Sequence, residues 1–260
     1  MELSIIIVTY NCLEKTKVCL RSIFAHAVPD LNFEVIIVDN NSTENIDSLT
    51  RDFPQIKLIK NQANLGMGAG NNIGVKEASG KYLLILNPDT ELKPNTLDLL
   101  LRYAKEHPEV GVIGPKIMYP DGERQISCYR FPDFFMPLYR RTFFGQINKS
   151  YLKNYLMQNF DLDQTTQADW LMGSCLLIPA EIFRAVGGFD ERFFMYFEDT
   201  DLCRKIWAIN KKIIYFPFAE IIHHHGRASA KSHWLVSIFK NKMARIHVIS
   251  HLKYFLKWGI

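Results

Sequence analysis

The 260-residue chain lacks the cysteine patterns and the long apolar runs that mark secreted disulfide proteins and membrane proteins. Its five cysteines lie far apart, without a CxxC pair, which argues against a disulfide framework and a zinc site. No apolar stretch approaches the ~18 residues that a transmembrane helix needs, and no basic residues precede the apolar N-terminal run. We therefore expect reduced, packed cysteines and a cytoplasmic location.

The chain also has little net charge. Its 31 basic and 27 acidic residues leave a net charge of +4, which is too small to indicate nucleic acid and compatible with anionic substrates or a lipid surface. Hydrophobic residues make up 48% and charged residues 22% of the chain, which is ordinary globular composition. We expect a folded protein with no nucleic-acid partner.

The first half alternates apolar, β-branched runs with helical patterns. Strands are expected at residues 4–10, 33–38, 56–60 and 82–86, and helices at 14–25, 46–53, 69–77 and from Pro94 onward. Strands this apolar are covered on both faces, as a parallel sheet requires. Such sheets bind ligands beyond the carboxyl ends of their strands, where polar residues gather in this chain.

The second half is less regular. From about residue 119 to 167 the periodicity gives way to an aromatic and basic segment, which we interpret as an insertion. Order returns with residues 170–179, followed by elements that we expect at 180–186 (helix), 187–190 (turn), 199–210 (helix) and 212–216 (strand).

Asn87-Pro88-Asp89 directly follows the apolar run 82–86. A hard divalent cation takes oxygen ligands and often bridges a protein carboxylate to substrate phosphates. Asp89 can supply that carboxylate. The structural alternative is a helix-capping Asx turn before Pro94.

Asp39 ends the expected strand 33–38. A carboxylate there can accept the imide N–H of uracil or thymine, and the alternative is an N-cap for the next helix. The glycine-rich segment 64–72 offers backbone amides before a helix, which suits a phosphate or a ribose. Its spacing matches neither GxGxxG nor GxxxxGK[ST], which disfavours a dinucleotide fingerprint and a P-loop.

Two further clusters carry chemistry. Glu198-Asp199-Thr200-Asp201 places three carboxylates at a helix start, where one can serve as a general base, whereas capping needs only one acid. His223-His224-His225 ends an apolar run, and three adjacent histidines favour at least one exposed ligand over a core histidine.

Taken in order, these segments resemble the family 2 glycosyltransferases, in particular a bacterial rhamnosyltransferase-like branch. The resemblance spans about residues 3–230 and rests on IIIVTYN, EVIIVDNNST, NLGMGAGNNIG, LILNPDT, DWLMGSCLLIP and GGFDERFFMYFEDTDLCRK. It implies an α/β fold of the GT-A type with a mixed central sheet. The expected parts are a Rossmann-like nucleotide-sugar-binding half (1–115), an acceptor-binding half (116–230) and a C-terminal amphipathic helical segment (231–260).

The resemblance also implies site residues, a dTDP- or UDP-sugar donor, and Mg²⁺ or Mn²⁺ on its diphosphate. Asp199 becomes the inverting base beside Glu198, and Asp89 with His223, or His224 as the near alternative, holds the metal. The acceptor side is implied for Asp169, Trp170 and Gly173. The nucleotide-sugar site is implied for Thr9, Tyr10, Asn11, Asp39, Asn64, Gly66, Asn71, Asn87 and Asp89.

The implied reaction is one inverting transfer to a hydroxyl of a glycan or lipid-linked glycan. The Q-x-x-R-W signature of processive synthases is absent, and Asn87 replaces the first acid of the usual DxD motif, which weakens metal binding before the diphosphate arrives. Two alternatives remain at this point: a nucleotidylyltransferase and a non-catalytic sugar-nucleotide-binding protein.

Residues 234–258 mix Trp, Phe, Ile and Leu with Lys and Arg. Leu235, Ile238, Phe239, Met243, Ile246 and Ile249 recur at helical spacing. We expect a helix that lies peripherally on the inner face of the cytoplasmic membrane, or one that packs against the catalytic domain.

Overall fold

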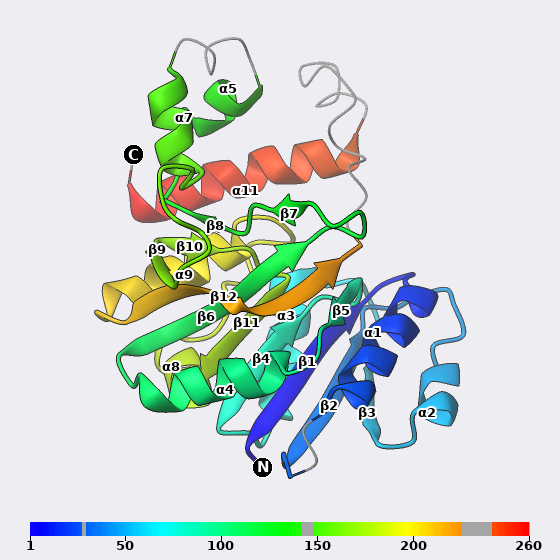
Figure 1. The fold of residues 1–260 in the computed structure, drawn as a ribbon. Coiled ribbons are helices and arrows are strands. Elements are labelled where there is room, and N and C mark those ends of the chain that lie inside the picture. Colours follow the sequence, from blue (N-terminus) through cyan, green and yellow to red (C-terminus); the bar gives the residue numbers. More distant parts are fainter. Residues whose placement is uncertain (28–29, 142–147, 225–240, 260) are drawn as a thin grey trace.

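The computed structural model describes residues 1–27, 30–141, 148–224 and 241–259 (Figure 1). Its centre is a ten-stranded sheet in which eight strands run in the order β3-β2-β1-β4-β11-β6-β12-β5. The first half contributes β1 (Leu3–Thr9), α1 (Leu13–Ala25), β2 (Phe33–Asp39), α2 (Ser48–Asp52), β3 (Ile56–Lys60), α3 (Met67–Lys76), β4 (Tyr82–Leu86), β5 (Thr90–Leu92) and α4 (Thr96–Glu106).

The second half of the chain completes the same sheet and adds helices above it. It contributes β6 (Val110–Met118), β7 (Arg124–Gln125), β8 (Cys128–Tyr129), α5 (Met136–Arg141), α7 (Lys149–Tyr155), β9 (Thr166–Ala168), β10 (Trp170–Leu171), β11 (Cys175–Pro179), α8 (Ala180–Ala185), α9 (Glu198–Ala208), β12 (Lys212–His223) and α11 (Lys242–Trp258).

The predicted parallel half is confirmed. β1 pairs in parallel with β2 and with β4, so that Thr9 lies beside Asp39 and Ile7 lies beside Leu86. This register brings the carboxyl ends of three strands to one edge of the sheet, and Asn87 continues from β4 at that edge.

The other half is mixed. β11 runs antiparallel to β4 and β6, whereas β12 runs parallel to β6 and antiparallel to β5. The strand expected at 212–216 instead continues to His223 across a register shift between Phe216 and Glu220. Pro217 lies within this shift, and proline lacks the N–H that a regular ladder needs.

The sequence prediction missed β5 and β6, as well as the short strands β7, β8 and β9. β6 contains two glycines and Pro115, which hide its apolar pattern, and β5 has only three residues. The helix expected from Pro94 begins at Thr96, after Asn95 in a left-handed conformation (φ 64°). The short β5 is nevertheless important, because it links the segment after Asp89 to the end of β12.

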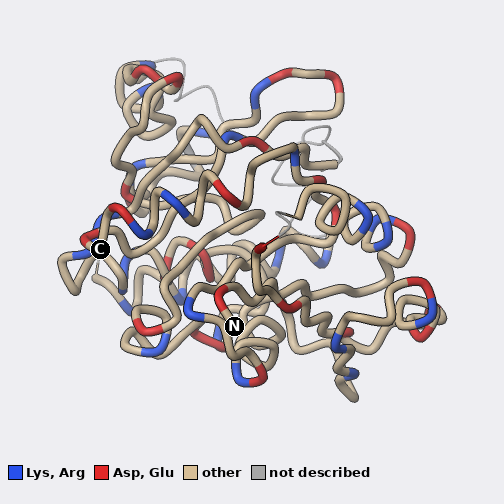
Figure 2. The backbone as a smooth tube through the Cα atoms, turned by 60° about the horizontal axis from the view of Figure 1, so that its bottom comes forward, with Lys and Arg blue, Asp and Glu red and all other residues tan. Residues whose placement is uncertain are grey.

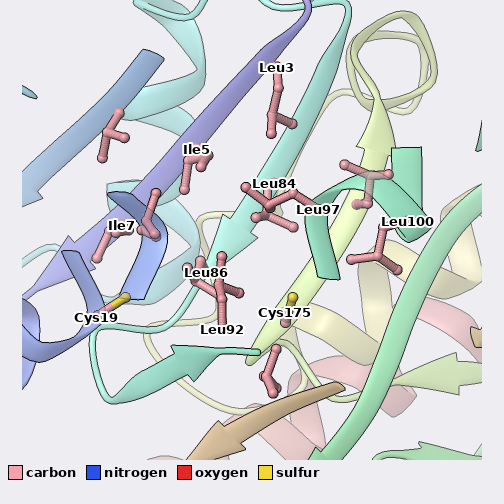
Figure 3. Packing of buried hydrophobic residues seen from close by; sticks show 14 of the residues in the cluster. Leu3, Ile5, Ile7, Cys19, Leu84, Leu86, Leu92, Leu97, Leu100 and Cys175 are labelled. Carbon is pink, nitrogen blue, oxygen red and sulfur yellow. The ribbon is translucent and has the colours of Figure 1, made fainter. Parts of the chain in front are cut away.

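Alternate side chains of the strands point to opposite faces of the sheet, and each face packs against helices. Ile5 and Ile7 of β1 lie in a cluster with residues of α1 and α4, and Figure 3 shows this packing together with the buried thiols of Cys19 and Cys175. The opposite face, with Ile6 of β1 and Ile85 of β4, packs against α8 and α9. All five cysteines are free thiols and four are buried, which confirms their prediction as packing residues.

The described residues of the segment 119–167 form short strands and the small helices α5 and α7, which lie above the sheet in Figure 1. The C-terminal helix α11 runs across the same side of the molecule. Of the predicted C-terminal segment, residues 231–240 with Leu235, Ile238 and Phe239 lie outside the described residues, as does His225. Within the described ranges, no helix combines the length and apolar character needed to cross a bilayer.

Candidate active site

Asp89 and His223 meet at the carboxyl edge of the sheet. His223 Nε2 lies 3.3 Å from Asp89 Oδ1, and Lys15 Nζ lies 3.8 Å from Asp89 Oδ2. Burial raises the pKa of Asp89, but the hydrogen bond and charge of His223, with help from Lys15, outweigh it and leave the pKa below its usual value. Asp89 therefore keeps its negative charge and faces an imidazole nitrogen.

Two buried polar side chains contact Nδ1 of the His223 imidazole. Its Nδ1 lies 3.0 Å from Gln125 Oε1 and 3.5 Å from Ser174 Oγ, and all three side chains are buried. Because an amide oxygen can only accept, Nδ1 donates in this contact. Nε2 faces the Asp89 carboxylate, to which it can donate, and without its proton it can bind a metal ion. No pattern in the sequence points to Gln125, which reaches the site only because β7 pairs with β6.

His223 and His224 point to different partners. His224 Nε2 contacts Glu91 Oε1, while the His224 backbone N–H donates to the carbonyl of Asp89 at 2.8 Å. Successive side chains of a strand alternate in direction, so only one of the two faces the Asp89 carboxylate. The structure selects His223.

The loops after β1 and β2 are tied together. Asn11 Oδ1 accepts the Thr43 N–H at 2.8 Å, and the Asn11 N–H donates to Ser42 Oγ at 2.9 Å. Asp39 is buried, and both its carboxylate oxygens accept the Ser42 N–H at 3.2 Å. The predicted nucleoside residues Asn11 and Asp39 thus belong to one small loop cluster.

Thr9 and Tyr10 lie differently from each other. Thr9 is fully buried, and its hydroxyl lies 2.9 Å from that of Thr16 in α1. Its side chain therefore links the end of β1 to α1. Tyr10 is about half exposed at the strand end. Tyr10, rather than Thr9, presents its side chain to the open edge.

The glycine-rich segment does not match the expectation of bare amides for a phosphate. The Gly66 N–H donates to Asn64 Oδ1 at 3.0 Å, and the Met67 N–H donates to the Phe194 carbonyl at 2.9 Å. Gly66 has φ +87°, and a Cβ on it would lie 2.1 Å from the Phe194 carbonyl oxygen. The expectation was wrong for these amides, because the segment packs against the loop before α9.

Asn71 of the same segment is buried in α3. Its side-chain amide donates to the Met67 carbonyl at 3.0 Å, and its side-chain oxygen has no hydrogen-bond partner among the described residues. Asn71 therefore retains one buried acceptor.

Glu198 and Asp199 begin α9 as adjacent carboxyl groups. Asp199 Oδ2 accepts the Gly173 N–H at 2.9 Å and Oδ1 accepts the Thr200 N–H at 2.7 Å, whereas Glu198 Oε2 has no partner among the described residues. Burial, then the Asp199 charge, raises the pKa of Glu198 to about 8. Burial also raises the pKa of Asp199, against the opposing hydrogen bonds. Burial thus raises the pKa of both carboxyl groups, and the hydrogen bonds from Gly173 and Thr200 favour the ionised form on Asp199 rather than on Glu198.

The dipeptide Gly173-Ser174 joins the two parts of the site. Its glycine N–H binds Asp199, while the Ser174 carbonyl accepts the Asn87 N–H at 2.9 Å. A Cβ at Gly173 would lie 3.2 Å from the Cβ of Asp199, so a larger residue would press on that carboxylate. Strand pairing between β4 and β11 therefore fixes the Asn87–Asp89 segment relative to Asp199.

Comparison with known proteins identifies the family of this chain. The sequence pattern described as "Glycosyl transferase family 2" matches residues 4–169, which is more than half of the chain. The chain belongs to glycosyltransferase family 2. Both alternatives given above fall away, because members of this family are enzymes that transfer a sugar from a nucleotide-sugar donor.

Curated relatives of this glycosyltransferase include rhamnosyltransferases. It is 30% identical over 213 residues to an N-acetylglucosaminyl-diphospho-decaprenol L-rhamnosyltransferase of Mycobacterium tuberculosis, covering 76% of this chain and 68% of the relative. It is 26% identical over 265 residues to the rhamnosyltransferase WbbL of Escherichia coli, covering 96% and 91%. The predicted rhamnosyltransferase-like resemblance is confirmed.

Solved structures confirm the GT-A fold. The mannosyltransferase of Pyrobaculum calidifontis in complex with GDP-Man and Mn²⁺ aligns with a TM-score of 0.64 at 18% identity, covering 100% of this chain and 65% of that one. GalNAc-T7 with UDP, GalNAc and Mn²⁺ aligns with a TM-score of 0.69 at 16% identity, covering 86% and 43%.

The remaining predicted acceptor residues of the glycosyltransferase support a neighbouring loop. Asp169 accepts hydrogen bonds from Arg130 Nη1 at 3.0 Å and from the Phe131 N–H at 2.9 Å. The Trp170 indole stacks on Tyr129, with ring centroids 4.3 Å apart, and donates to the Arg130 carbonyl at 2.9 Å. Only Gly173 of the predicted three contacts Asp199 directly.

Proposed function

We propose that this glycosyltransferase transfers a single sugar, with inversion, from dTDP-rhamnose or a UDP-hexose to a hydroxyl of a glycan or lipid-linked glycan in cell-envelope polysaccharide synthesis. The observation that carries this proposal is the Gly173-Ser174 bridge between Asn87 and Asp199. It joins an anionic edge suited to a metal–diphosphate with a carboxylate suited to an acceptor hydroxyl. The rhamnosyltransferase relatives favour dTDP-rhamnose among the donors.

We infer a division of the catalytic domain into the two expected halves. Residues 1–115 supply the nucleotide-sugar side, with Asn11, Tyr10 and Asp39 near the nucleoside. Residues 116–230 supply the acceptor side with Gly173 and the catalytic pair. In the glycine-rich segment, we keep only Asn64 and Asn71 as residues that support the donor site. The backbone N–H groups of Gly66 and Met67 already donate hydrogen bonds within the protein.

Asp89 and His223 fit a divalent cation, Mg²⁺ or Mn²⁺, that arrives with the diphosphate. Within the described residues no cluster of three His, Cys, Asp or Glu side chains could hold a metal ion. A pair suffices when substrate phosphates and water complete the coordination, as is common for these cations. When bound, the cation would offset the negative charge that builds on the departing nucleoside diphosphate. The neutral side chain of Asn87 adds no charge to this site.

Asp199 serves as the base in this proposal. The two backbone N–H donors favour its ionised form against the effect of burial, and a proton on Glu198 leaves no second negative charge beside it. Asp199 takes the proton of the acceptor hydroxyl while that oxygen forms the new bond to the anomeric carbon. Attack from the face opposite the leaving nucleoside diphosphate inverts the anomeric centre.

A donor screen with two variants tests the assignment. The purified enzyme is assayed with dTDP-rhamnose and UDP-hexoses, with and without Mn²⁺, for nucleotide binding and donor consumption. We expect Asp89→Ala to lose donor-dependent Mn²⁺ binding. Binding of none of these donors, or Mn²⁺ affinity unchanged in Asp89→Ala, would contradict the proposal.

The outer side of α11 supports a membrane contact. Four apolar side chains of the helix are exposed, and Leu256 is 87% exposed: Val248, Ile249, Leu252 and Leu256. At 100° per residue they share one face, next to the exposed basic residues Lys242 and Arg245. Figure 2 shows that basic and acidic residues are both spread along the chain, whereas α11 contains basic residues and no acidic ones.

We infer that this face lies on anionic lipid at the inner side of the cytoplasmic membrane and presents the site to a lipid-linked acceptor. Each basic residue near an anionic surface contributes about 1 kcal/mol. Leu252→Glu with Leu256→Glu should abolish co-sedimentation with vesicles that contain phosphatidylglycerol. Ile209→Glu, at an apolar residue that follows α9 and is about as exposed as Leu252, is the control. Binding that survives the double substitution would exclude this face.

A further inference from the structure

The inner side of α11 contacts the loop that leads into the catalytic pair. Ser250 Oγ donates to the Met195 carbonyl at 2.8 Å, and Lys253 Nζ donates to the Arg192 carbonyl at 2.6 Å. Arg204 of α9 lies 3.0 Å from the Tyr254 hydroxyl. The helix is therefore attached along its length to residues 192–204, whether or not its outer side contacts a membrane.

The strongest attachment is at the last turn of α11. Asp201, which is fully buried, receives Lys257 Nζ at 2.7 Å and the Trp258 indole N–H at 2.7 Å. Lys257 also lies 2.8 Å from Asp190. A buried carboxylate needs charge and hydrogen-bond partners, and here two of them come from the C-terminal turn. Asp201 lies only two residues after Asp199 in α9.

The backbone between these attachments is strained. Tyr196 and Phe197 have φ of 68° and 66°, a left-handed conformation that bulky residues rarely adopt. Both side chains are covered by α11: His247 lies 4.8 Å from the Tyr196 ring, and Tyr254 lies 5.2 Å from the Phe197 ring. Such a conformation persists only when surrounding contacts impose it, and it occurs at functional sites. Here it directly precedes Glu198 and Asp199.

We propose that the C-terminal turn of α11 is a positioning clamp for the catalytic pair, with Lys257 and Trp258 as positioning residues that act through Asp201. The clamp holds α9 and the left-handed turn at Tyr196-Phe197. Asp199 therefore keeps its hydrogen bond to Gly173 and its orientation toward the acceptor hydroxyl. This inference rests on the proposed role of Asp199 as base.

The alternative is that these contacts only stabilise the fold. The two ideas differ in kinetics, since misplacing a base by about 1 Å can cost on the order of 100-fold in rate without weakening distant ligand contacts. Among the described residues, no hydrogen bond or ion pair joins Asp39 or Asp89 of the nucleotide edge to α11. A clamp therefore affects kcat and leaves nucleotide affinity unchanged.

The test uses the full chain with Lys257→Met, Lys257→Arg and Trp258→Phe. We expect Lys257→Met to lower kcat about 10- to 100-fold with UDP or dTDP affinity within twofold of the unsubstituted enzyme, and Lys257→Arg to restore most of the rate. Trp258→Phe removes a single hydrogen bond and provides a folded variant if Lys257→Met does not fold. Lys76→Met, at the exposed last turn of α3, is the matched control.

The outcomes separate the clamp from the proposed function. A lowered melting temperature with unchanged kcat in folded Trp258→Phe and Lys257→Met would overturn the clamp and leave Asp199 as base. Activity that survives Asp199→Asn would instead remove the proposed function on which the clamp rests.

Discussion

The nucleotide edge and the catalytic pair are built in opposite ways. Asp39 ends β2 and Asn87 follows β4, so the register of a parallel array brings them to one edge. Asp199 is held by Gly173, 26 residues away, and its helix by Lys257, 56 residues from Asp201. The comparison teaches that backbone pairing of strands forms the nucleotide edge, whereas individual hydrogen bonds and ion pairs from other segments hold the catalytic pair.

The largest effect is expected at the catalytic pair. Asp199→Asn should lower the transfer rate by roughly 10²-fold or more, the usual contribution of a general base, because an amide cannot take the acceptor proton. The amide oxygen can still accept the Gly173 N–H, so nucleotide affinity should stay unchanged in calorimetry. An equal loss of nucleotide binding would erase the distinction between the two sides.

At the nucleotide edge, Asp39→Ala should weaken binding of UDP or dTDP by about 1.5–3 kcal/mol, because it removes a charged hydrogen-bond acceptor. Isothermal calorimetry on the free nucleotide measures this directly. Asp47→Ala, an exposed acid before α2, is the control and should bind as the unsubstituted enzyme does. Unchanged affinity in Asp39→Ala would reduce Asp39 to a turn cap for Ser42.

Gln125 lies 98 residues from His223 in the sequence. It therefore tests whether the donor side also depends on a side chain from a distant segment. Gln125→Leu removes the acceptor for the imidazole N–H and should lower Mn²⁺ affinity, measured with UDP present, about 10- to 100-fold. Gln125→Glu keeps an acceptor and should retain affinity. Nitrogen NMR of His223 should show loss of the Nδ1–H tautomer preference in the leucine variant alone, and equal tautomers in both variants would refute this role.

The smallest effect concerns stability and pH. The pKa of Glu198 in the folded state, about 8, lies above its ordinary 4.5, so the protonated form favours folding at low pH. That contribution is fully present below about pH 4.5 and is lost as the pH rises through about 8. Glu198→Gln does not titrate, so its melting temperature relative to the unsubstituted enzyme should rise from pH 5 to pH 9. Glu181→Gln, exposed in α8, should show no such trend.

Much of the donor side was predictable because its signals are local. The apolar strands ending in Thr9, Asp39 and Leu86 were recognised from runs of β-branched and aliphatic residues, and their parallel pairing is confirmed. The predicted family and GT-A fold are confirmed as well. The roles assigned to the site residues remain predictions, and the glycine segment shows why: its glycines fit a phosphate loop and a packed turn equally well.

The sequence by itself determined the parallel half of the sheet, the family and the identity of the acids at the strand and helix ends, because residue type and short-range spacing carry that information. Only the tertiary structure decided that His223 and not His224 faces Asp89, that Gln125 holds its ring, and that the C-terminal turn reaches Asp201. Those contacts join residues between 56 and 134 positions apart. Such contacts are set by strand pairing and helix packing, which no local pattern of residues encodes.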